Sequence, residues 1–406
     1  MNIIDIINKK KNNIELTYDE LSFAFNGYLK KDIPDYQMSA LLMSITINGM
    51  TYQETMNLTE IFINSGEVYT FSKKTCDKHS TGGIGDTCTF IVGPIVAALD
   101  IPMAKMSGKG LGITGGTIDK LESIPGFNVN LTKDEYYHNI NSVGLVVGAQ
   151  TDNLVPMDKV IYALRDVTGT TESIPLIASS IMSKKIACGA TYIVIDIKCG
   201  EGALLKTEED AEKLSEWLIK IGNHFNKNVK TIVTAMDEPL SSSIGNALEI
   251  KEAIEILNGK ECKLYDTSIL IAANIISMAK NISVDEGVVL AVNTIKNGNA
   301  YKMFQKWISS QGGDISKIKV SDKVLEIKSN KTGIIKHISA LACGKLSIKL
   351  GAGRLTKDSN IDYGVGIKLL KQTGDKVSNG DILAELYVND YNIKLDNNDL
   401  NLFNIE

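Results

Sequence analysis

The feature that most constrains the fold of this chain is a change of pattern near residue 69. Up to residue 66 the sequence carries only helical signals, including capping boxes in which Thr17 precedes Glu20 and Thr51 precedes Glu54. Beyond residue 69, short β-type runs, glycine-rich loops and helical segments alternate, which is typical of a mostly parallel α/β sheet. We therefore expect a helical module followed by an α/β domain.

The remaining segments complete this organisation. Residues 155–166 and 173–188 again have a helical pattern, the second ending at Gly189, and turn signals punctuate the strand-rich end of the chain at Gly374–Asp375 and Asn379–Gly380. The predicted fold class is α/β with a separate helical domain, a mixed or mostly parallel central sheet flanked by helices, and a small C-terminal α+β unit. The expected boundaries are 1–66 and 155–189 for the helical domain, 67–154 and 190–320 for the α/β domain, and 321–406 for the C-terminal α+β unit packed on the α/β domain.

Composition narrows the class of function. The 406 residues are 44% hydrophobic and 22% charged, and the net charge of -5 argues against nucleic acid as the main partner. Apolar runs such as Thr89–Leu99 are too short to cross a bilayer. Six cysteines occur without a CxxC pair, so neither a zinc site nor a disulfide framework is indicated. We expect a cytoplasmic protein that acts on small molecules, with no nucleic-acid or membrane partner.

The first segment that carries chemistry is Asp77–Thr87, with the sequence DKHSTGGIGDT. Its glycines allow backbone amides to approach a ligand, and a helix follows directly, so the segment favours an anion. Lys78, Ser80 and Thr81 add one cation and two hydroxyl groups. The segment is not a Walker A loop, because no GK[ST] follows at the required spacing. The alternative is a flexible turn with polar residues placed by chance.

A second glycine-rich segment, 107–122, follows a strand that carries Lys105 and again leads into a helix. Gly110, Gly112 and Gly115 satisfy GxGxxG, which raises an NAD-dependent oxidoreductase as an alternative. That fold expects an acid at the end of the next strand about 20 residues on. Here the next acids, Asp134 and Glu135, open a predicted helix instead, so the oxidoreductase stays a distant alternative.

The third constellation lies on the two middle helices. Tyr162 and Arg165 are three residues apart, and Ser180 and Lys184 are four apart, so each pair shares a helix face. Arginine and lysine only donate hydrogen bonds whereas serine also accepts them, a set that suits the edge of a pyrimidine in an open cleft. The alternative is an ordinary helix surface with solvated charges.

Several long motifs resemble, in order and spacing, those of the thymidine and pyrimidine-nucleoside phosphorylase family. They are DKHSTGGIGD, SGKGLGITGGTIDKLESIPGF, YALRDVT, SIPLIASSIMSKK, LGAGR, IDYGVGI and GDKVSNGDILAELYVND. The resemblance implies reversible phosphorolysis of pyrimidine nucleosides (thymidine, deoxyuridine, uridine) to free base and (2-deoxy-)α-D-ribose 1-phosphate, in nucleoside salvage. It also implies inorganic phosphate as co-substrate, no organic cofactor, and a homodimer formed through the helical domain.

The resemblance assigns roles residue by residue. The phosphate-binding residues are Lys78, Ser80, Thr89, Ser107 and Thr117. The base-binding residues are Tyr162, Arg165, Ser180 and Lys184. His79, Arg165 and Lys184 are the catalytic residues, with His79 close to the base as a donor of a proton or hydrogen bond. A structural potassium ion is implied at Gly85, Thr87, Leu240, Ser243 and Glu252.

Three positions bear on specificity. Lys105 matches members of the family that also accept ribonucleosides, so it is expected to set the choice of sugar. Lys109 replaces the arginine that is usual in the SGRG signature and so loses a planar, bidentate donor. Ile113 stands where many relatives have histidine. Both departures predict an altered loop or weaker phosphate binding, and neither removes an assigned substrate residue.

A phosphoribosyltransferase of the anthranilate type is the alternative within the same fold class. It also joins a helical domain to an α/β domain and acts at a sugar C1 atom. It would require a pyrophosphorylated ribose and magnesium, so phosphate-dependent release of a pyrimidine without magnesium separates the two.

Overall fold

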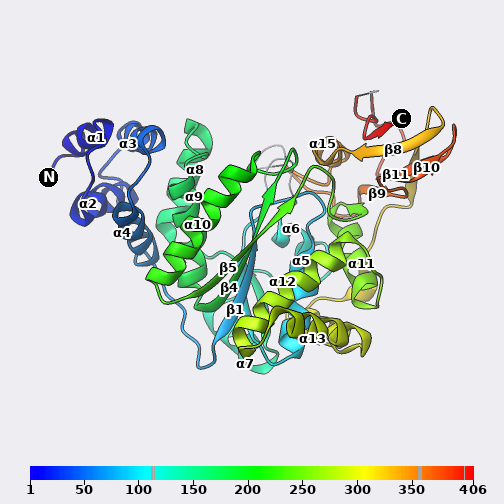
Figure 1. The fold of residues 1–406 in the computed structure, drawn as a ribbon, viewed down its shortest axis with the longest axis horizontal. Helices are drawn as coiled ribbons and strands as arrows, with labels where there is room; N and C mark the ends of the chain where they lie inside the picture. Colours follow the sequence, from blue (N-terminus) through cyan, green and yellow to red (C-terminus); the bar gives the residue numbers. More distant parts are fainter. Residues whose placement is uncertain (111–112, 114, 355–358, 397) are drawn as a thin grey trace. The chain divides into compact units, whose positions relative to one another are not determined.

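The computed structural model describes residues 1–110, 113, 115–354, 359–396 and 398–406. The chain divides into two compact units (Figure 1). The first, here called the helical unit, comprises Met1–Asp77, Gln150–Ile193 and Glu209–Thr231. The second, the α/β unit, comprises Lys78–Ala149, Val194–Glu208 and Ile232–Glu406.

The helical unit starts with four helices, α1 (Ile3–Lys11), α2 (Tyr18–Leu29), α3 (Asp35–Asn48) and α4 (Tyr52–Ile63). Both predicted capping boxes are confirmed: the Thr17 and Thr51 hydroxyl groups accept from the amides of Glu20 and Glu54, and each glutamate bonds back to its cap amide. Glu54 also receives the Lys10 ammonium at 2.7 Å, with both side chains buried. The first turn of α4 is thereby tied to the end of α1.

Three further helices belong to this unit, α8 (Pro156–Thr168), α9 (Ile174–Ala187) and α10 (Glu208–His224). The predicted stop of α9 is confirmed, since Gly189 has φ +82°, a conformation that glycine adopts without a steric penalty. Helix α9 packs closely on α4, and Thr59 of α4 donates to Ser179 of α9 at 3.0 Å in the interior. This packing fixes the helix that carries Ser180 and Lys184.

The central sheet has the order β3-β2-β1-β4-β5. Its strands are β1 (Thr75–Ser80), β2 (Met103–Ser107), β3 (Leu145–Ala149), β4 (Ala190–Cys199) and β5 (Asn228–Ala235). β2 and β3 run parallel, with Lys105 beside Val147. The expected mostly parallel sheet is confirmed, and the residue ranges of the two units meet within β1, β4 and β5.

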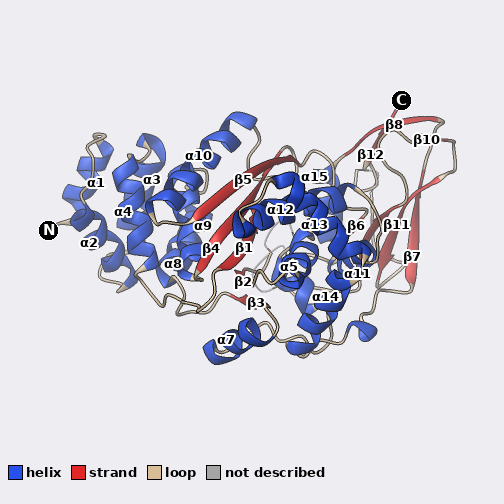
Figure 2. Ribbon diagram, turned by 60° about the horizontal axis from the view of Figure 1, so that its bottom comes forward, coloured by secondary structure: helices blue, strands red, loops and turns tan. Residues whose placement is uncertain are grey.

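The α/β unit contains a cluster of helices gathered around α5 (Figure 2). The cluster consists of α5 (Cys88–Ala98), α11 (Asn246–Leu257), α12 (Lys263–Lys280), α13 (Val284–Lys296) and α14 (Asn299–Ser310). The same unit also contains α6 (Thr117–Glu122), α7 (Lys133–Ser142) and the 3₁₀ turn η1 (Ile315–Lys317). Trp307 of α14 is fully buried, with its ring 6.1 Å from Phe90 of α5 and 5.9 Å from Phe304. In the described residues no single helix is both long and apolar enough to span a membrane, and only the pair α12 and α13, bent by 116°, meets the length and composition test together.

The end of the chain forms the predicted small α+β unit, and one short strand from earlier in the chain, β6, joins one of its sheets. A four-stranded antiparallel sheet has the order β6-β9-β11-β7, and a three-stranded one the order β10-β8-β12. The elements are β6 (Ser243–Ile244), β7 (Lys323–Lys328), β8 (Gly333–Ile338), α15 (Ala340–Leu350), β9 (Gly366–Leu369), β10 (Lys376–Val377), β11 (Ile382–Val388) and β12 (Phe403–Ile405). Both predicted turns are present, with φ +95° at Gly374 and +93° at Gly380.

Candidate active site

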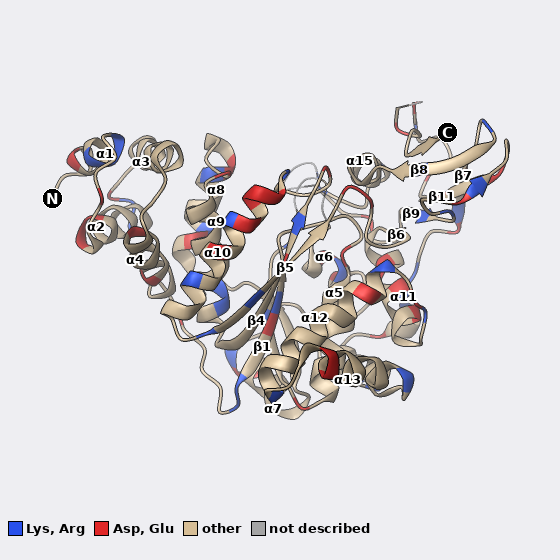
Figure 3. Cartoon of the chain, viewed as in Figure 1, with Lys and Arg blue, Asp and Glu red and all other residues tan. Residues whose placement is uncertain are grey.

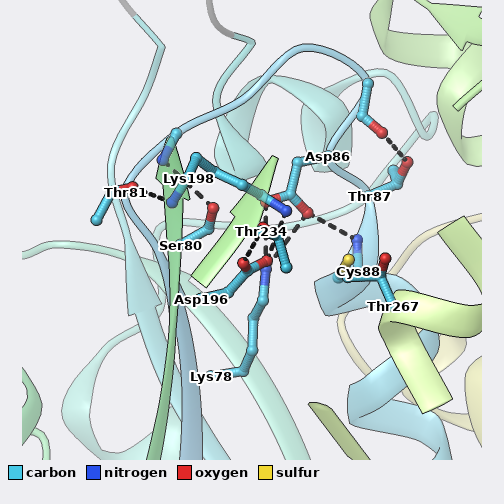
Figure 4. Close-up of polar contacts among 12 residues, drawn as sticks. Lys78, Ser80, Thr81, Asp86, Thr87, Cys88, Asp196, Lys198, Thr234 and Thr267 are labelled. Atoms are coloured by element: carbon cyan, nitrogen blue, oxygen red, sulfur yellow. Dashed lines mark hydrogen bonds and ion pairs between the residues drawn. The ribbon is translucent and has the colours of Figure 1, made fainter. Parts of the chain in front are cut away.

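Lys78 is the central cation of the first glycine-rich segment. It lies on β1, is 1% exposed, and points its Nζ to within 3.3 Å of both carboxylate oxygens of Asp86 (Figure 4). Its backbone carbonyl accepts a hydrogen bond from the buried Lys105 ammonium at 2.6 Å. Backbone and side chain of Lys78 are therefore both fixed, as an anion-binding lysine requires for precise placement.

Asp86 organises the loop between β1 and α5. It accepts the Cys88 amide at 3.1 Å, and its own carbonyl accepts the Lys120 ammonium at 2.8 Å. Burial raises the pKa of Asp86, but the attraction of Lys78 and Lys198, together with a hydrogen bond from Ser80 and the charge of Lys120, outweighs burial and holds that pKa well below its ordinary value. Burial lowers the pKa of Lys78, but Asp86 and the neighbouring groups, including Asp196, together outweigh this effect, so the pKa of Lys78 is raised. Both groups are charged at neutral pH.

A second buried ion pair lies next to the first, on β4. Lys198 and Asp196 are both 0% exposed, with Nζ and Oδ2 2.7 Å apart. Thr234 of β5 donates to Asp196 at 2.6 Å, and the Lys198 amide donates to the Thr81 hydroxyl at 2.8 Å. Figure 3 shows acidic and basic residues together on β1 and β4, within the sheet. The sequence analysis missed this pair, although two charges at alternate positions of an otherwise apolar strand were a usable signal.

The groups Asp86, Cys88 and Asp196 lie within 4.8 Å of one another, a spacing that a metal ion could accept. The lysine ammoniums of Lys78 and Lys198 already neutralise the two carboxylates. Burial, followed by the neighbouring Asp86, raises the pKa of the Cys88 thiol to about 12, so it stays protonated and a poor ligand. This cluster is an ion-pair network built around lysines.

The other predicted phosphate residues all belong to the α/β unit. Ser80 ends β1, Thr89 lies buried in the first turn of α5, Ser107 ends β2 and Thr117 starts α6. His79 is half-buried on β1 between Lys78 and Ser80. Leu111, Gly112 and Thr114 lie outside the described residues, including the second glycine of the GxGxxG pattern.

Lys109 and Ile113, the two departures from the family pattern, each have a defined contact partner. Lys109 is half-exposed and pairs with Glu122 of α6 at 2.8 Å. Ile113 packs against α15, where a Cβ on Gly344 would lie 3.1 Å from that of Ile113. An apolar residue at position 113 therefore has an apolar contact with the C-terminal part of the chain.

The residues assigned to a cation come from two loops and one helix of the same unit. The Leu240 amide donates to the Ile84 carbonyl at 3.0 Å, and the Cβ position of Gly85 lies 2.4 Å from the Ser241 hydroxyl. Glu252 of α11 accepts the Ser243 amide at 2.7 Å. The loop holding Gly85 and Thr87 is thus next to the segment that runs from Leu240 to Ser243 at the start of β6, and the buried carboxylate of Glu252 lies beside that segment.

In the helical unit, three of the four predicted base residues come together around Lys184. Its Nζ lies 3.1 Å from the Ser180 hydroxyl and 5.9 Å from the centre of the Tyr162 ring. It also pairs at 2.6 Å with Asp158, a buried residue one turn before Tyr162 on α8. Asp158 was missed by the sequence analysis, although Asp158, Tyr162 and Arg165 share one face of a helix.

Arg165 differs from the expectation that it lies open in a cleft. It is 2% exposed, and its guanidinium donates to the carbonyls of Thr170 and Thr171, each at 3.0 Å. Burial lowers its pKa, while Asp158 and Tyr162 oppose that shift. The expectation of an exposed side chain was wrong, because the turn after α8 leaves two carbonyls that this guanidinium satisfies. Arg165 therefore holds the loop between α8 and α9 through two hydrogen bonds, and its charge also interacts with the Tyr162 hydroxyl group.

Comparisons with known proteins match the three parts of the fold. Residues 4–66 match a helical bundle domain of a glycosyl transferase family, residues 72–301 its a/b domain, and residues 334–398 a pyrimidine nucleoside phosphorylase C-terminal domain. The chain is 46% identical over 404 residues to the pyrimidine-nucleoside phosphorylase of Bacillus subtilis, covering 97% of this chain and 93% of that one. It is 44% identical to the enzyme of the same name from Geobacillus stearothermophilus, covering 96% and 92%.

Among solved structures, the fold resembles anthranilate phosphoribosyltransferase from Thermus thermophilus. The TM-score is 0.62 and the identity 14%, covering 75% of this chain and 98% of the other, so this likeness concerns the fold alone. A dinucleotide-binding fold would need an acid at the end of a strand in this region of the sequence. The chain instead forms helix α7 over Lys133–Ser142, and Glu135 is part of the capping box that opens it. These matches do not favour either alternative. From its motifs, its three matched domains and its near full-length similarity to curated relatives, the chain belongs to the pyrimidine-nucleoside phosphorylase family.

Proposed function

We propose that this protein catalyses the reversible phosphorolysis of thymidine, deoxyuridine and uridine, giving the free pyrimidine and the α-anomer of the sugar 1-phosphate. The observation that carries this proposal is the buried Lys78 ammonium, held 3.3 Å from Asp86 among hydroxyl-bearing residues. A fixed cation in a dry, polar setting suits a small anion such as phosphate. The activity belongs to nucleoside salvage.

Phosphate is proposed to bind in the α/β unit, with Lys78 as the cation and Ser80, Thr89, Ser107 and Thr117 as hydroxyl donors. A phosphate oxygen then attacks C1′ on the face opposite the base, which inverts the configuration at that carbon. The attack needs an oxygen held in line with the bond that breaks. The double fixation of Lys78 through Lys105 and Asp86 supports this requirement.

The pyrimidine is proposed to bind in the helical unit. Breaking the glycosidic bond moves negative charge onto the departing base, so the base site must offer donors and positive charge. Lys184 and Arg165 supply the charge, Ser180 and Tyr162 complete the set, and His79 supplies a proton or hydrogen bond to the base. The cluster of Tyr162, Ser180 and Lys184 supports this assignment.

Three finer assignments accompany this function. Lys105 is proposed to favour ribonucleosides through the 2′ hydroxyl. Potassium is proposed to bind at Gly85, Thr87, Leu240, Ser243 and Glu252, and the closeness of these loops supports it. A homodimer is proposed to form through the helical unit, where Phe23, Tyr36, Met43 and Ile47 are exposed.

The test is a turnover assay with purified protein, thymidine or uridine, and inorganic phosphate in the presence of a chelator of magnesium. The expected result is release of thymine or uracil together with an equal amount of sugar 1-phosphate, strictly dependent on phosphate. A phosphoribosyltransferase of the anthranilate type would be inactive in this mixture. That enzyme would instead consume anthranilate with a pyrophosphorylated ribose and magnesium.

A further inference from the structure

The backbone of Gly110, in the second glycine-rich segment, is held on both sides by one ion pair. The Gly110 amide donates to Asp119 Oδ2 at 2.6 Å, and the Gly110 carbonyl accepts from Arg354 Nη1 at 3.4 Å. Arg354 Nη1 also donates to Asp119 Oδ1 at 2.6 Å. The three groups form a closed set in which Asp119 is 2% exposed, so the pair holds the backbone on both sides of the Gly110 Cα atom.

The two ends of this loop also touch each other. A Cβ on Gly116 would lie 2.1 Å from the Gly110 nitrogen and 2.6 Å from Asp119 Oδ2, a space that only glycine leaves open. Gly110 follows Ser107 by three residues, and Asp119 follows Thr117 by two. The pair therefore holds backbone three residues after Ser107 and includes a side chain two residues after Thr117, and both of these residues are proposed to bind phosphate.

The segment that carries Arg354 is itself held in place by helix α11. The buried side-chain amide of Asn246, at the start of α11, donates to the Ala352 carbonyl at 2.9 Å, two residues before Arg354. A second tie runs in parallel, because Tyr363 donates to Glu122 of α6 at 2.9 Å, and Glu122 pairs with Lys109. Both acids of α6 thus connect the glycine-rich segment to residues 354 and 363.

We propose that Asp119 and Arg354 are positioning residues for phosphate. In this proposal they do not contact phosphate. They hold the backbone at Gly110, in the segment that connects Ser107 to Thr117. This inference rests on the proposed function and adds to it two residues that sequence motifs alone left without a role. A loosened loop raises the KM for phosphate and leaves the KM for the nucleoside unchanged, because the four base-binding residues on α8 and α9 belong to the other unit.

The test compares Arg354→Met with Arg354→Lys and with a matched control, Lys349→Met. Lys349 is also a cation of the C-terminal part, at the end of α15, and it pairs with Asp399 and not with a residue of the glycine-rich segment. Arg354→Met should raise the KM for phosphate about tenfold, since a charge-assisted bond to a nearly buried carboxylate is lost. Arg354→Lys should recover part of that loss, and Lys349→Met should behave as the native protein.

A second variant guards against misfolding of the first. Asp119→Asn keeps the size of the side chain and an acceptor for the Gly110 amide while removing the ion pair with Arg354. It should raise the KM for phosphate severalfold at unchanged kcat with saturating phosphate. Equal rises in both KM values, or native phosphate KM in a folded Arg354→Met or Asp119→Asn variant, overturns the inference. If the native protein releases no base from any nucleoside, the proposed function fails instead, and titration of inorganic phosphate alone into Arg354→Met still tests the loop.

Discussion

The two halves of the proposed active site are built differently. In the α/β unit, Lys78 and Lys198 are fully buried and each has a carboxylate partner in Asp86 or Asp196. In the helical unit, the side chain of Lys184 is 26% exposed and Tyr162 is 50% exposed. The difference fits the two ligands, because a small dianion needs fixed, desolvated charge whereas a planar base must enter between side chains. Arg165 is the exception, since it is about as buried as Lys78 and Lys198.

The largest effect is expected from Lys78→Met. Removing the fixed cation should lower kcat/KM for phosphate by about 100-fold or more. It also leaves Asp86 buried without its closest counter-ion, so the variant should lose stability as well. The double variant Lys78→Met with Asp86→Asn should regain stability and remain inactive. Recovery of phosphate turnover in the double variant would show that Lys78 acts only through Asp86.

The base half is tested by comparing Lys184→Gln with Arg165→Ala. Each should lower kcat by about 100-fold, because each removes a donor to the departing base. Arg165→Ala should also lower the free energy of unfolding by about 1 to 3 kcal/mol for each carbonyl left unpaired at Thr170 and Thr171. Lys184→Gln keeps a donor for Asp158 and should unfold closer to the native midpoint. Urea denaturation beside steady-state kinetics separates the two, and equal stability losses contradict this view of Arg165.

Much of the fold follows from local pattern. Capping boxes at Thr17, Thr51 and Thr132 and the stop at Gly189 depend on neighbours within four residues, which the sequence shows directly. The site is only partly local. Ser180 and Lys184 are visible as one helix face, but the pairing of Lys184 with Asp158 joins two helices, and that of Arg354 with Asp119 spans 235 positions. Strand or helix periodicity could have marked Asp196 and Asp158 as candidates, but no spacing rule predicts the partner of Asp158 on another helix or the pairing of Asp86 with Lys78.

Two roles are open to Lys105, which are selection of the sugar and placement of Lys78. The sequence assigns it to ribose, whereas the structure shows its ammonium bonded to the Lys78 carbonyl at 2.6 Å. Lys105→Met should lower kcat/KM for uridine about tenfold more than for deoxyuridine, if a 2′ hydroxyl loses its donor. The ratio of the two values is the measurement. An equal fall for both nucleosides with a higher KM for phosphate assigns Lys105 to the placement of Lys78 instead.

The smallest effect concerns pH and the Asp86 pair. Because the pKa of folded Asp86 is held well below its ordinary value, its charge stabilises the fold at all pH values above the unfolded pKa of about 3.9. That stability is lost as the pH falls through the folded pKa. The stability difference between native protein and Asp86→Asn should thus stay constant from about pH 8 to 5 and narrow below about pH 4. A difference that already narrows near pH 6 points to another titrating group.

The division of labour between the two units is tested most directly by calorimetric titration of inorganic phosphate, without nucleoside, into native protein, Lys184→Gln and Lys78→Met. The account predicts native phosphate affinity for Lys184→Gln and an affinity at least about tenfold weaker for Lys78→Met, because one charge-assisted contact is lost only in the latter. Phosphate binding that disappears in Lys184→Gln, or that persists unchanged in a folded Lys78→Met protein, contradicts the account.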